Sequence, residues 1–325
     1  MIYIESRSNS PFYNFALEYY LMTEKEIDDM VFMFWRTTPT LMVGRFQNTY
    51  NEINLDYARE HNLQIVRRKS GGGTIYTDMG SWQFTFITPK SDGKIDFARF
   101  IEPVVEAIRS LGADVDFNGR NDLVVGGRKF SGNAQYMKNG KTLHHGSILF
   151  DTNIEEMVRS TTVDEYKIIS KGIQSVRERV TNLSEHLPSK MSMEEFKQIM
   201  VQRILADQGS IYELNEGEMK RIQEIEKLEF DNWDKIFGES PACSINLKKH
   251  FTGGTIQTHL DVDKGVIRHL KIYGDFFGDI DIESVCSLLI GCPYEKKSVM
   301  EKLKNTPSLG NIYGIRAEEF AEALF

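Results

Sequence analysis

Three consecutive glycines, Gly71 to Gly73, are the feature that most restricts how this chain can fold. Glycine loses more backbone entropy on folding than any other residue, so an ordered run of three needs a compensating gain. The apolar run Leu63–Val66 leads directly into the glycines, and Trp82–Ile87 beyond them alternates as a strand does. The sequence therefore predicts a loop between two strands, with Arg67, Arg68 and Lys69 at its entrance.

Such a loop is a candidate anion site. The missing Cβ atoms allow backbone N–H groups to approach a ligand, and glycine turns can form anion-binding concavities. The guanidinium groups of Arg67 and Arg68 suit phosphate or carboxylate. Neither the GxxxxGK[ST] pattern of a P-loop nor the GxGxxG dinucleotide fingerprint is present. Taken alone, the loop is equally compatible with an ordinary hairpin that carries exposed cations.

Hydrophobic periodicity predicts further elements before residue 230. Helices are expected at residues 11–25, 96–111 and 192–206, and strands at 31–35, 40–43, 123–125 and 143–150. Pro103 predicts a kink in the second helix or a later start. A length of 325 residues exceeds what one hydrophobic core usually serves, so two domains are expected.

The composition of the sequence changes near Phe230, where Asn, Gly, Ser and Pro residues predict a linker. Beyond it, Thr255–Val262 and Val266–Tyr273 predict a hairpin, followed by helices near 282–290 and 295–304. We expect a first domain at residues 1–243 and a small α+β domain at residues 244–325.

Composition excludes several classes of protein. The net charge of -8 argues against a nucleic-acid or anionic-membrane partner. The N-terminus has no signal-peptide pattern, and the apolar run Val31–Trp35 is far too short to span a bilayer. Cys243, Cys286 and Cys292 form no CxxC pair, which predicts free buried thiols in a cytoplasmic protein.

A second cluster, residues 119–133, reads GRNDLVVGGRKFSGN. Asp122 precedes an apolar strand and is a candidate ligand for Mg²⁺ or a hydrogen-bond acceptor for a base. Lys129 is placed to face a developing phosphorane charge. The alternative is a type I′ hairpin at Gly126-Gly127 with a solvated Arg-Lys pair, which is the simpler interpretation of these residues alone.

Two further clusters are candidates. His144 and His145 are adjacent in an expected strand, so one should face inward and one outward, which makes them poor ligands for one metal. A packed or ligand-shaping histidine is the expectation. Residues 171–183, KGIQSVRERVTNL, could form a lid over an anionic intermediate or a short exposed helix.

Taken together and in this order, these clusters resemble the lipoate-protein ligase A family. Residues 67–78 are similar to its RRxSGGGxVxxD signature, and residues 119–133 to its GRNDLxV and K(I/V)SGxA block. Residues 143–150 resemble its HHGxLL strand, and residues 171–183 its KGIxSVRxRVxNL loop. The resemblance runs from about Phe12 to the C-terminus and includes a WxWxFGxxP-like region and a GDFFG-like turn at Gly274–Gly278.

The resemblance implies an α+β fold of the biotin/lipoate ligase type, with a mixed sheet and a C-terminal accessory domain. It implies an enzyme that uses ATP and Mg²⁺ to convert (R)-lipoate to lipoyl-AMP. The lipoyl group would then pass to a lysine of apo lipoyl domains, in dehydrogenase E2 subunits or the glycine-cleavage H protein.

The resemblance also assigns residues. Lys129 would be catalytic and contact both the carboxyl oxygen and the α-phosphate, and Asp122 would anchor adenosine or Mg²⁺. His145 would lie against the acyl pocket. The further substrate- and nucleotide-binding residues would be Arg67, Arg68, Ser70, Gly71, Gly72, Gly73, Thr74, Ile75, Tyr76, Asn121, Ser131, Gly132 and Gly146. The loop closing over the adenylate would contribute Lys171, Gly172, Ser175, Arg177 and Arg179.

Departures from the family pattern occur at Thr77, Ser81 and Asn133, and they concern the shape of the acyl pocket. Two alternatives remain. An octanoyltransferase of the same fold needs a thiolate in the first domain, whereas every cysteine lies at residue 243 or beyond. A non-catalytic lipoyl-domain binder would not need Asp122 and Lys129.

Overall fold

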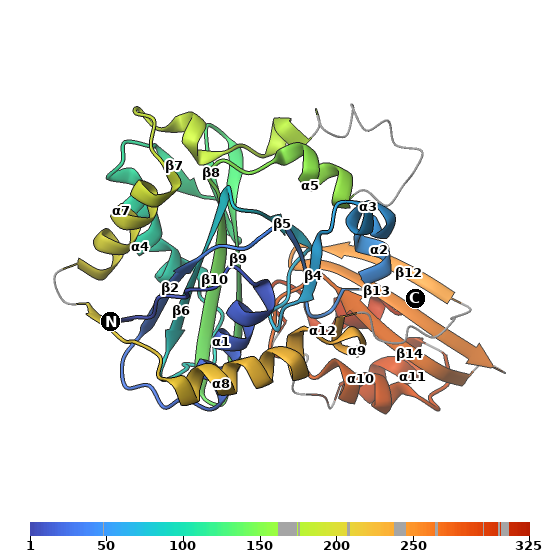
Figure 1. Cartoon of the computed structure of the whole chain (residues 1–325). Coiled ribbons are helices and arrows are strands. Elements are labelled where there is room, and N and C mark those ends of the chain that lie inside the picture. The colour runs from blue at the N-terminus through green and yellow to red at the C-terminus, as the bar shows by residue number, and fades with distance from the viewer. Residues whose placement is uncertain are drawn as a thin grey trace.

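The computed structural model describes residues 1–47, 49–161, 174, 176–206, 209–236, 245–263, 266–294, 296–304, 306 and 312–325. Its central element is a twisted mixed sheet with the strand order β11–β1–β2–β6–β10–β9–β8–β7 (Figure 1). In that order the strands are Ser210–Ile211, Ile2–Tyr3, Val31–Trp35, Ser81–Thr88, Lys141–Leu149, Arg128–Lys138, Asp122–Val125 and Val115–Phe117. β1 runs parallel to β2 and β11, and the other pairs are antiparallel.

Helices cover both faces of this sheet. Phe32 and Phe34 of β2 pack with α4 (Phe97–Arg109) and α7 (Met193–Leu205). Val31, Met33 and Trp35, which alternate with them, pack with α1 (Pro11–Thr23) and α8 (Glu216–Ile225). β2 and β6 are therefore buried along their whole length, and the continuous apolar run of β2, Val31–Trp35, reflects burial on both sides.

A smaller sheet of order β4–β3–β5 holds the glycine loop. Its strands are Gln64–Arg67, Thr40–Val43 and Ile75–Thr77, and the glycines lie between β4 and β5. The remaining helical elements described before residue 237 are α2 (Thr49–Glu52), α3 (Leu55–Glu60), α5 (Ile154–Thr161), η1 (Leu183–His186), the π-helix η3 (Glu226–Phe230) and α9 (Trp233–Ile236).

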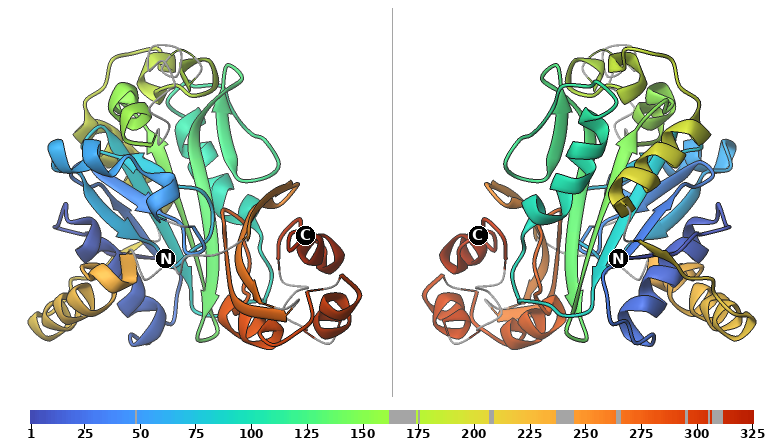
Figure 2. Two further views of the ribbon diagram at one scale, coloured as in Figure 1. Left: turned by 90° about the vertical axis from the view of Figure 1, so that its right-hand side faces the viewer. Right: turned by 90° about the vertical axis from the view of Figure 1, so that its left-hand side faces the viewer.

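The C-terminal domain has its own sheet, β12–β13–β14, with strands Ile245–Phe251, Gly254–Asp263 and Val266–Gly274. Its helices α10 (Ile282–Leu289), α11 (Lys296–Leu303) and α12 (Ala317–Glu322) share one core with that sheet. In both views of Figure 2 this domain lies beside the main sheet. Phe46 stacks on Phe276 with ring centroids 4.6 Å apart, which joins the two parts.

The α+β fold with a mixed sheet is confirmed, as are the strands at 31–35 and 40–43. Of the two effects predicted for Pro103, a kink or a later start, the later start does not occur: the second helix begins at Phe97 because the Asp96 side chain caps it. The expectation that one histidine faces outward is also wrong. His144 and His145 do point to opposite faces, but helices cover both faces and both rings are buried.

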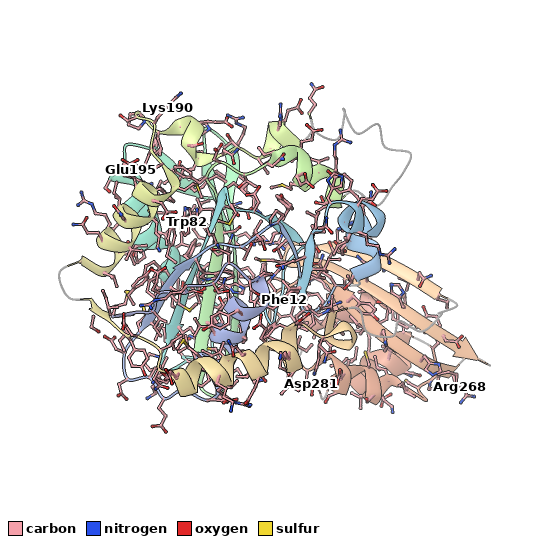
Figure 3. All side chains as sticks on the ribbon, in the orientation of Figure 1. Phe12, Trp82, Lys190, Glu195, Arg268 and Asp281 are labelled. Atoms are coloured by element: carbon pink, nitrogen blue, oxygen red, sulfur yellow. The ribbon has the colours of Figure 1, made fainter. Side chains whose placement is uncertain are left out.

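Figure 3 illustrates the layering: the labelled Trp82 lies within the layer between the sheet and α7, and Arg268 projects from the C-terminal domain. In the part of the chain that the structure describes, no helix is long and apolar enough to cross a membrane.

Candidate functional site

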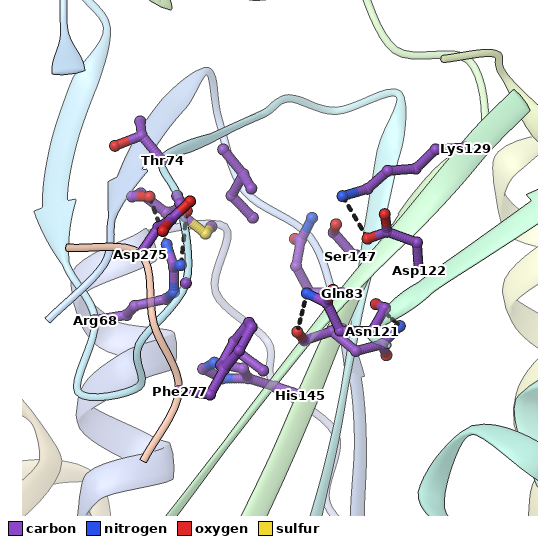
Figure 4. A pocket seen from close by; sticks show the side chains of 18 of the residues that line it. Arg68, Thr74, Gln83, Asn121, Asp122, Lys129, His145, Ser147, Asp275 and Phe277 are labelled. Atoms are coloured by element: carbon purple, nitrogen blue, oxygen red, sulfur yellow. Dashed lines mark hydrogen bonds and ion pairs between the residues drawn. The ribbon is translucent and has the colours of Figure 1, made fainter. Parts of the chain in front are cut away.

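A cavity of about 250 Å³ opens between the glycine loop and the main sheet. One wall is formed by Arg68 and residues 72–75, and the opposite wall by β8, β9 and β10 (Figure 4). Of the residues expected from the sequence, those on its lining are Arg68, Gly72, Gly73, Thr74, Ile75, Asn121, Asp122, Lys129, Gly132, His145 and Gly146.

The polar end of the cavity contains an ion pair. The Lys129 ammonium lies 2.6 Å from Asp122 Oδ1, and the two side chains are 39% and 23% exposed. The residues come together because β8 and β9 form a hairpin over Gly126 and Gly127, whose φ values of 55° and 76° suit a type I′ turn. The predicted glycine hairpin is therefore confirmed, and the Asp122 and Lys129 side chains reach the cavity. Their chemical roles stay a prediction.

The Arg68 side chain stabilises the glycine loop through hydrogen bonds to backbone carbonyl oxygens. Its guanidinium donates to the carbonyl oxygens of Met42 at 2.7 Å, Gly71 at 2.9 Å and Gly73 at 2.7 Å. Burial, and then the charge of Arg67, lower the pKa of this guanidinium to about 10. Gly72 has a φ of 91°, a conformation that glycine adopts without strain. Arg68 thus lines the cavity while its donors hold the loop.

Arg67 lies elsewhere. It donates to the carbonyl oxygens of Gln47 at 2.6 Å and Ile236 at 2.7 Å, and to Thr49 Oγ1 at 2.5 Å. Arg67 does not line this cavity, nor does it line the adjoining second cavity described below. Arg67 thereby connects the end of β4 to the end of α9. Ile236, the last residue of α9, is also the last residue described before the gap.

Ser70 and Gly71 support the loop from behind. Ser70 Oγ lies 2.7 Å from His145 Nε2 and is fully buried. A Cβ on Gly71 would overlap the carbonyl oxygen of Phe276, so the C-terminal domain requires glycine there. His145 lies on the cavity wall, and its Nδ1 is 3.1 Å from the carboxylate of Glu18 on α1.

The residues that line the apolar end of the cavity were not predicted from the sequence. They are Phe15 of α1, Trp35 of β2 and Met42 of β3, which looked like ordinary core residues. Gln83 and Ser147 also line the cavity and stand opposite each other in the β6–β10 register. Their polarity within continuous buried strands is the signal that could have marked them.

The C-terminal domain also contributes to the lining, through Asp275 and Phe277. The Gly72 N–H donates to the Phe276 carbonyl oxygen at 3.4 Å, and Gly274 N–H donates to the Phe46 carbonyl oxygen. The turn after β14 therefore lies directly against the glycine loop. The sequence singled out this turn as a motif but not as part of the site.

A second cavity of about 480 Å³ adjoins the first, and the residues common to both linings are Thr74, Ile75, Asp122, Lys129, Gly132 and Ser147. Its lining includes three other expected residues: Tyr76, Ser131 and Arg179. Arg177 lies on the exposed helical stretch 176–179 and outside both linings. Lys171, Gly172 and Ser175 lie outside the described residues.

His144, on the other face of the sheet, is part of the core. Its ring stacks on Phe100 with centroids 5.0 Å apart, and its Nε2 lies 3.2 Å from Asn133 Oδ1. Burial lowers the pKa of His144 well below its usual value, so the ring is neutral. Among the described residues, no group of three His, Cys, Asp or Glu side chains could hold a metal.

Residues 10–205 match the family model of the lipoyl protein ligase A/B catalytic domain. The chain belongs to the lipoate-protein ligase family. Residues 240–324 match the model of the bacterial lipoate protein ligase C-terminus. Lipoate-protein ligase LplJ of Bacillus subtilis is 39% identical, with 100% of both chains covered.

Solved structures show the same fold. P. falciparum LipL1, in complex with lipoate, superposes with a TM-score of 0.81 at 21% identity, covering 99% of this chain and 97% of that one. A lipoate-protein ligase A bound with ATP superposes with a TM-score of 0.61 at 21% identity, covering 73% and 98%.

Proposed function

We propose that this protein is an ATP-dependent lipoate-protein ligase that forms lipoyl-AMP and transfers the lipoyl group to a lysine of an apo lipoyl domain. The observation that carries the proposal is a single cavity lined both by an apolar cluster, Phe15, Trp35 and Met42, and by the ion pair of Asp122 and Lys129. An apolar acyl chain with a carboxylate at one end has the same polarity. The full-length relative named as a lipoate-protein ligase supports the same activity.

In the first step a lipoate carboxylate oxygen attacks the α-phosphorus of ATP. The bond to the bridging oxygen breaks, and pyrophosphate leaves. We assign Lys129 to the charge that develops on the α-phosphate and the carboxyl oxygen, because its ammonium projects from β9 into both cavities. Fixed cations at such positions stabilise the transition state without reorganisation.

We assign the backbone from Gly72 to Thr74 to the nucleotide and the activated acyl group. In the structure a Cβ on Gly73 would meet Asp275 Cβ at 3.9 Å, an ordinary contact. Gly73 also has no positive φ, so the folded loop alone does not require glycine there. Close approach of a ligand to the backbone is a reason for glycine at this position.

Magnesium fits this arrangement through Asp122. Mg²⁺ is commonly held by one or two carboxylates together with substrate phosphates. The Asp122 carboxylate borders both cavities, and its pairing with Lys129 would give way to the ion. Bound there, Mg²⁺ would neutralise phosphate charge.

In the second step the acceptor lysine attacks the acyl carbonyl, and AMP leaves. We propose lipoyl domains of dehydrogenase E2 subunits or the glycine-cleavage H protein as acceptors, in the cytoplasm. We further propose that residues 1–243 form the catalytic domain and residues 244–325 the accessory domain, with Lys171, Gly172, Ser175, Arg177 and Arg179 in the closing segment.

The test is lipoate-dependent exchange of labelled pyrophosphate into ATP. We expect exchange that requires both lipoate and the enzyme, because adenylate formation is reversible. An octanoyltransferase or a non-catalytic lipoyl-domain binder would show none, and that result would contradict the proposal.

A further inference from the structure

A buried carboxylate lies behind the cavity wall. Glu18 is 2% exposed, and its Oε1 accepts a hydrogen bond from Thr85 Oγ1 at 2.6 Å. His145 Nδ1 lies 3.1 Å from the same oxygen and 3.2 Å from Oε2. A buried carboxylate is costly unless its oxygens are paired, so these partners explain how α1 carries one here.

The direction of the hydrogen bonds follows from Trp35. Its indole Nε1 is a donor only, and it donates to Thr85 Oγ1 at 2.9 Å. The hydrogen of Thr85 is therefore available for Glu18, which accepts it. Carboxylate oxygens are hydrogen-bond acceptors, and in this arrangement the hydrogen between the ring and Glu18 lies on Nδ1 of His145.

The opposite nitrogen of the ring faces the glycine loop. In a neutral imidazole with hydrogen on Nδ1, Nε2 is an acceptor, and the Ser70 hydroxyl 2.7 Å away is its donor. In the sequence Ser70 lies between Arg68 and the glycines. Arg68 in turn donates hydrogen bonds to the carbonyl oxygens of Gly71 and Gly73. The chain of bonds thus joins a buried carboxylate on α1 to the entrance of the loop.

We infer that Glu18 is a positioning residue: it fixes His145 as the neutral Nδ1–H tautomer, and His145 anchors the glycine loop through Ser70 in the geometry that adenylation needs. Glu18 is not on the cavity lining, so it acts through His145 rather than on the substrate. This inference rests on the proposed ligase activity for its kinetic readout.

The kinetic test is a double-mutant cycle with Glu18→Gln, Ser70→Ala and the double variant, measured by lipoate-dependent pyrophosphate exchange. The glutamine amide offers Nδ1 a donor as well as an acceptor, so the tautomer is no longer fixed. We expect each single variant to lose about tenfold in exchange rate, as is usual when the support of a site residue is removed. The double variant should lose about tenfold as well, because both changes break one chain of bonds.

A control variant is Glu24→Gln, which removes a carboxylate at the end of the same helix, where Glu24 pairs with Arg221. Its exchange rate should match the wild type. An unchanged exchange rate in Glu18→Gln would overturn the inference. A loss of about a hundredfold in the double variant would also overturn it, because two independent tenfold losses multiply to that value.

The structural test does not depend on activity. ¹⁵N spectra of histidine-labelled protein, with His145 assigned from a His145→Gln variant, should show the neutral Nδ1–H form in the wild type and a tautomer mixture in Glu18→Gln. A wild-type ring that is charged or carries its hydrogen on Nε2 overturns the inference. Absence of exchange in the wild type would instead count against the proposed ligase activity.

Discussion

Replacing Lys129 by methionine should separate catalysis from stability. The Lys129 side chain is 39% exposed and pairs with one carboxylate, so its loss should cost about 1 kcal/mol of unfolding free energy or less. That corresponds to a melting shift of a few degrees. Loss of a fixed donor to developing transition-state charge typically costs about 10²–10³-fold in rate, or about 3–4 kcal/mol.

The assay is lipoate-dependent pyrophosphate exchange, measured beside a thermal melt of each variant. Lys138→Met is the matched control, because Lys138 lies at the far end of the same strand and its ammonium contacts the Tyr19 hydroxyl at 2.9 Å. We expect Lys129→Met to lose at least about a hundredfold in exchange with a nearly unchanged melting temperature. Exchange within about threefold of the wild type would refute the assignment of Lys129.

Three other predictions concern the loop and the thiols. Arg67→Met should lower the free energy of unfolding by about 3 kcal/mol, since several carbonyls lose a charged donor at about 1 kcal/mol each, while the KM for ATP in the folded fraction stays the same. Gly73→Ala should melt like the wild type but raise the KM for ATP, whereas Gly71→Ala should melt lower because its Cβ meets the Phe276 carbonyl. Burial raises the pKa of the Cys286 thiol to about 12, so this thiol should resist alkylation at pH 8 until the protein unfolds.

Each of these has a contrary outcome. A raised KM for ATP in Arg67→Met with normal stability would place Arg67 at the nucleotide. A lower melting temperature in Gly73→Ala would show that the loop itself needs glycine there. Peptide mapping that finds Cys286 alkylated in the folded protein would contradict its burial.

Much of the fold was predictable because local patterns agree with tertiary structure. The capping box at Ser192 and Glu195 begins α7 where the sequence indicates, and the alternation after Val266 gives β14. β9 (Arg128–Lys138) was missed because glycine, asparagine and charged residues interrupt its alternation. Those residues are tolerated there because the strand forms the cavity wall.

The site was predictable where one motif supplies neighbours, as the β8–β9 hairpin does for Asp122 and Lys129. Arg67 and Arg68 are adjacent and chemically alike, and the sequence does not show that their side chains have different surroundings. Glu18 and Phe277 were missed for a different reason. They reach the site from helix α1 and the C-terminal domain, through contacts between segments far apart in the chain.

The most direct test of the ligase account is the mass of an acceptor protein after incubation with enzyme, lipoate, ATP and Mg²⁺. Apo H protein and an apo E2 lipoyl domain should be tested in parallel, with ATP omitted as the control. We predict that at least one of them gains the mass of a single lipoyl group on its acceptor lysine, and that this gain depends on ATP. No acyl addition to either acceptor would contradict the account.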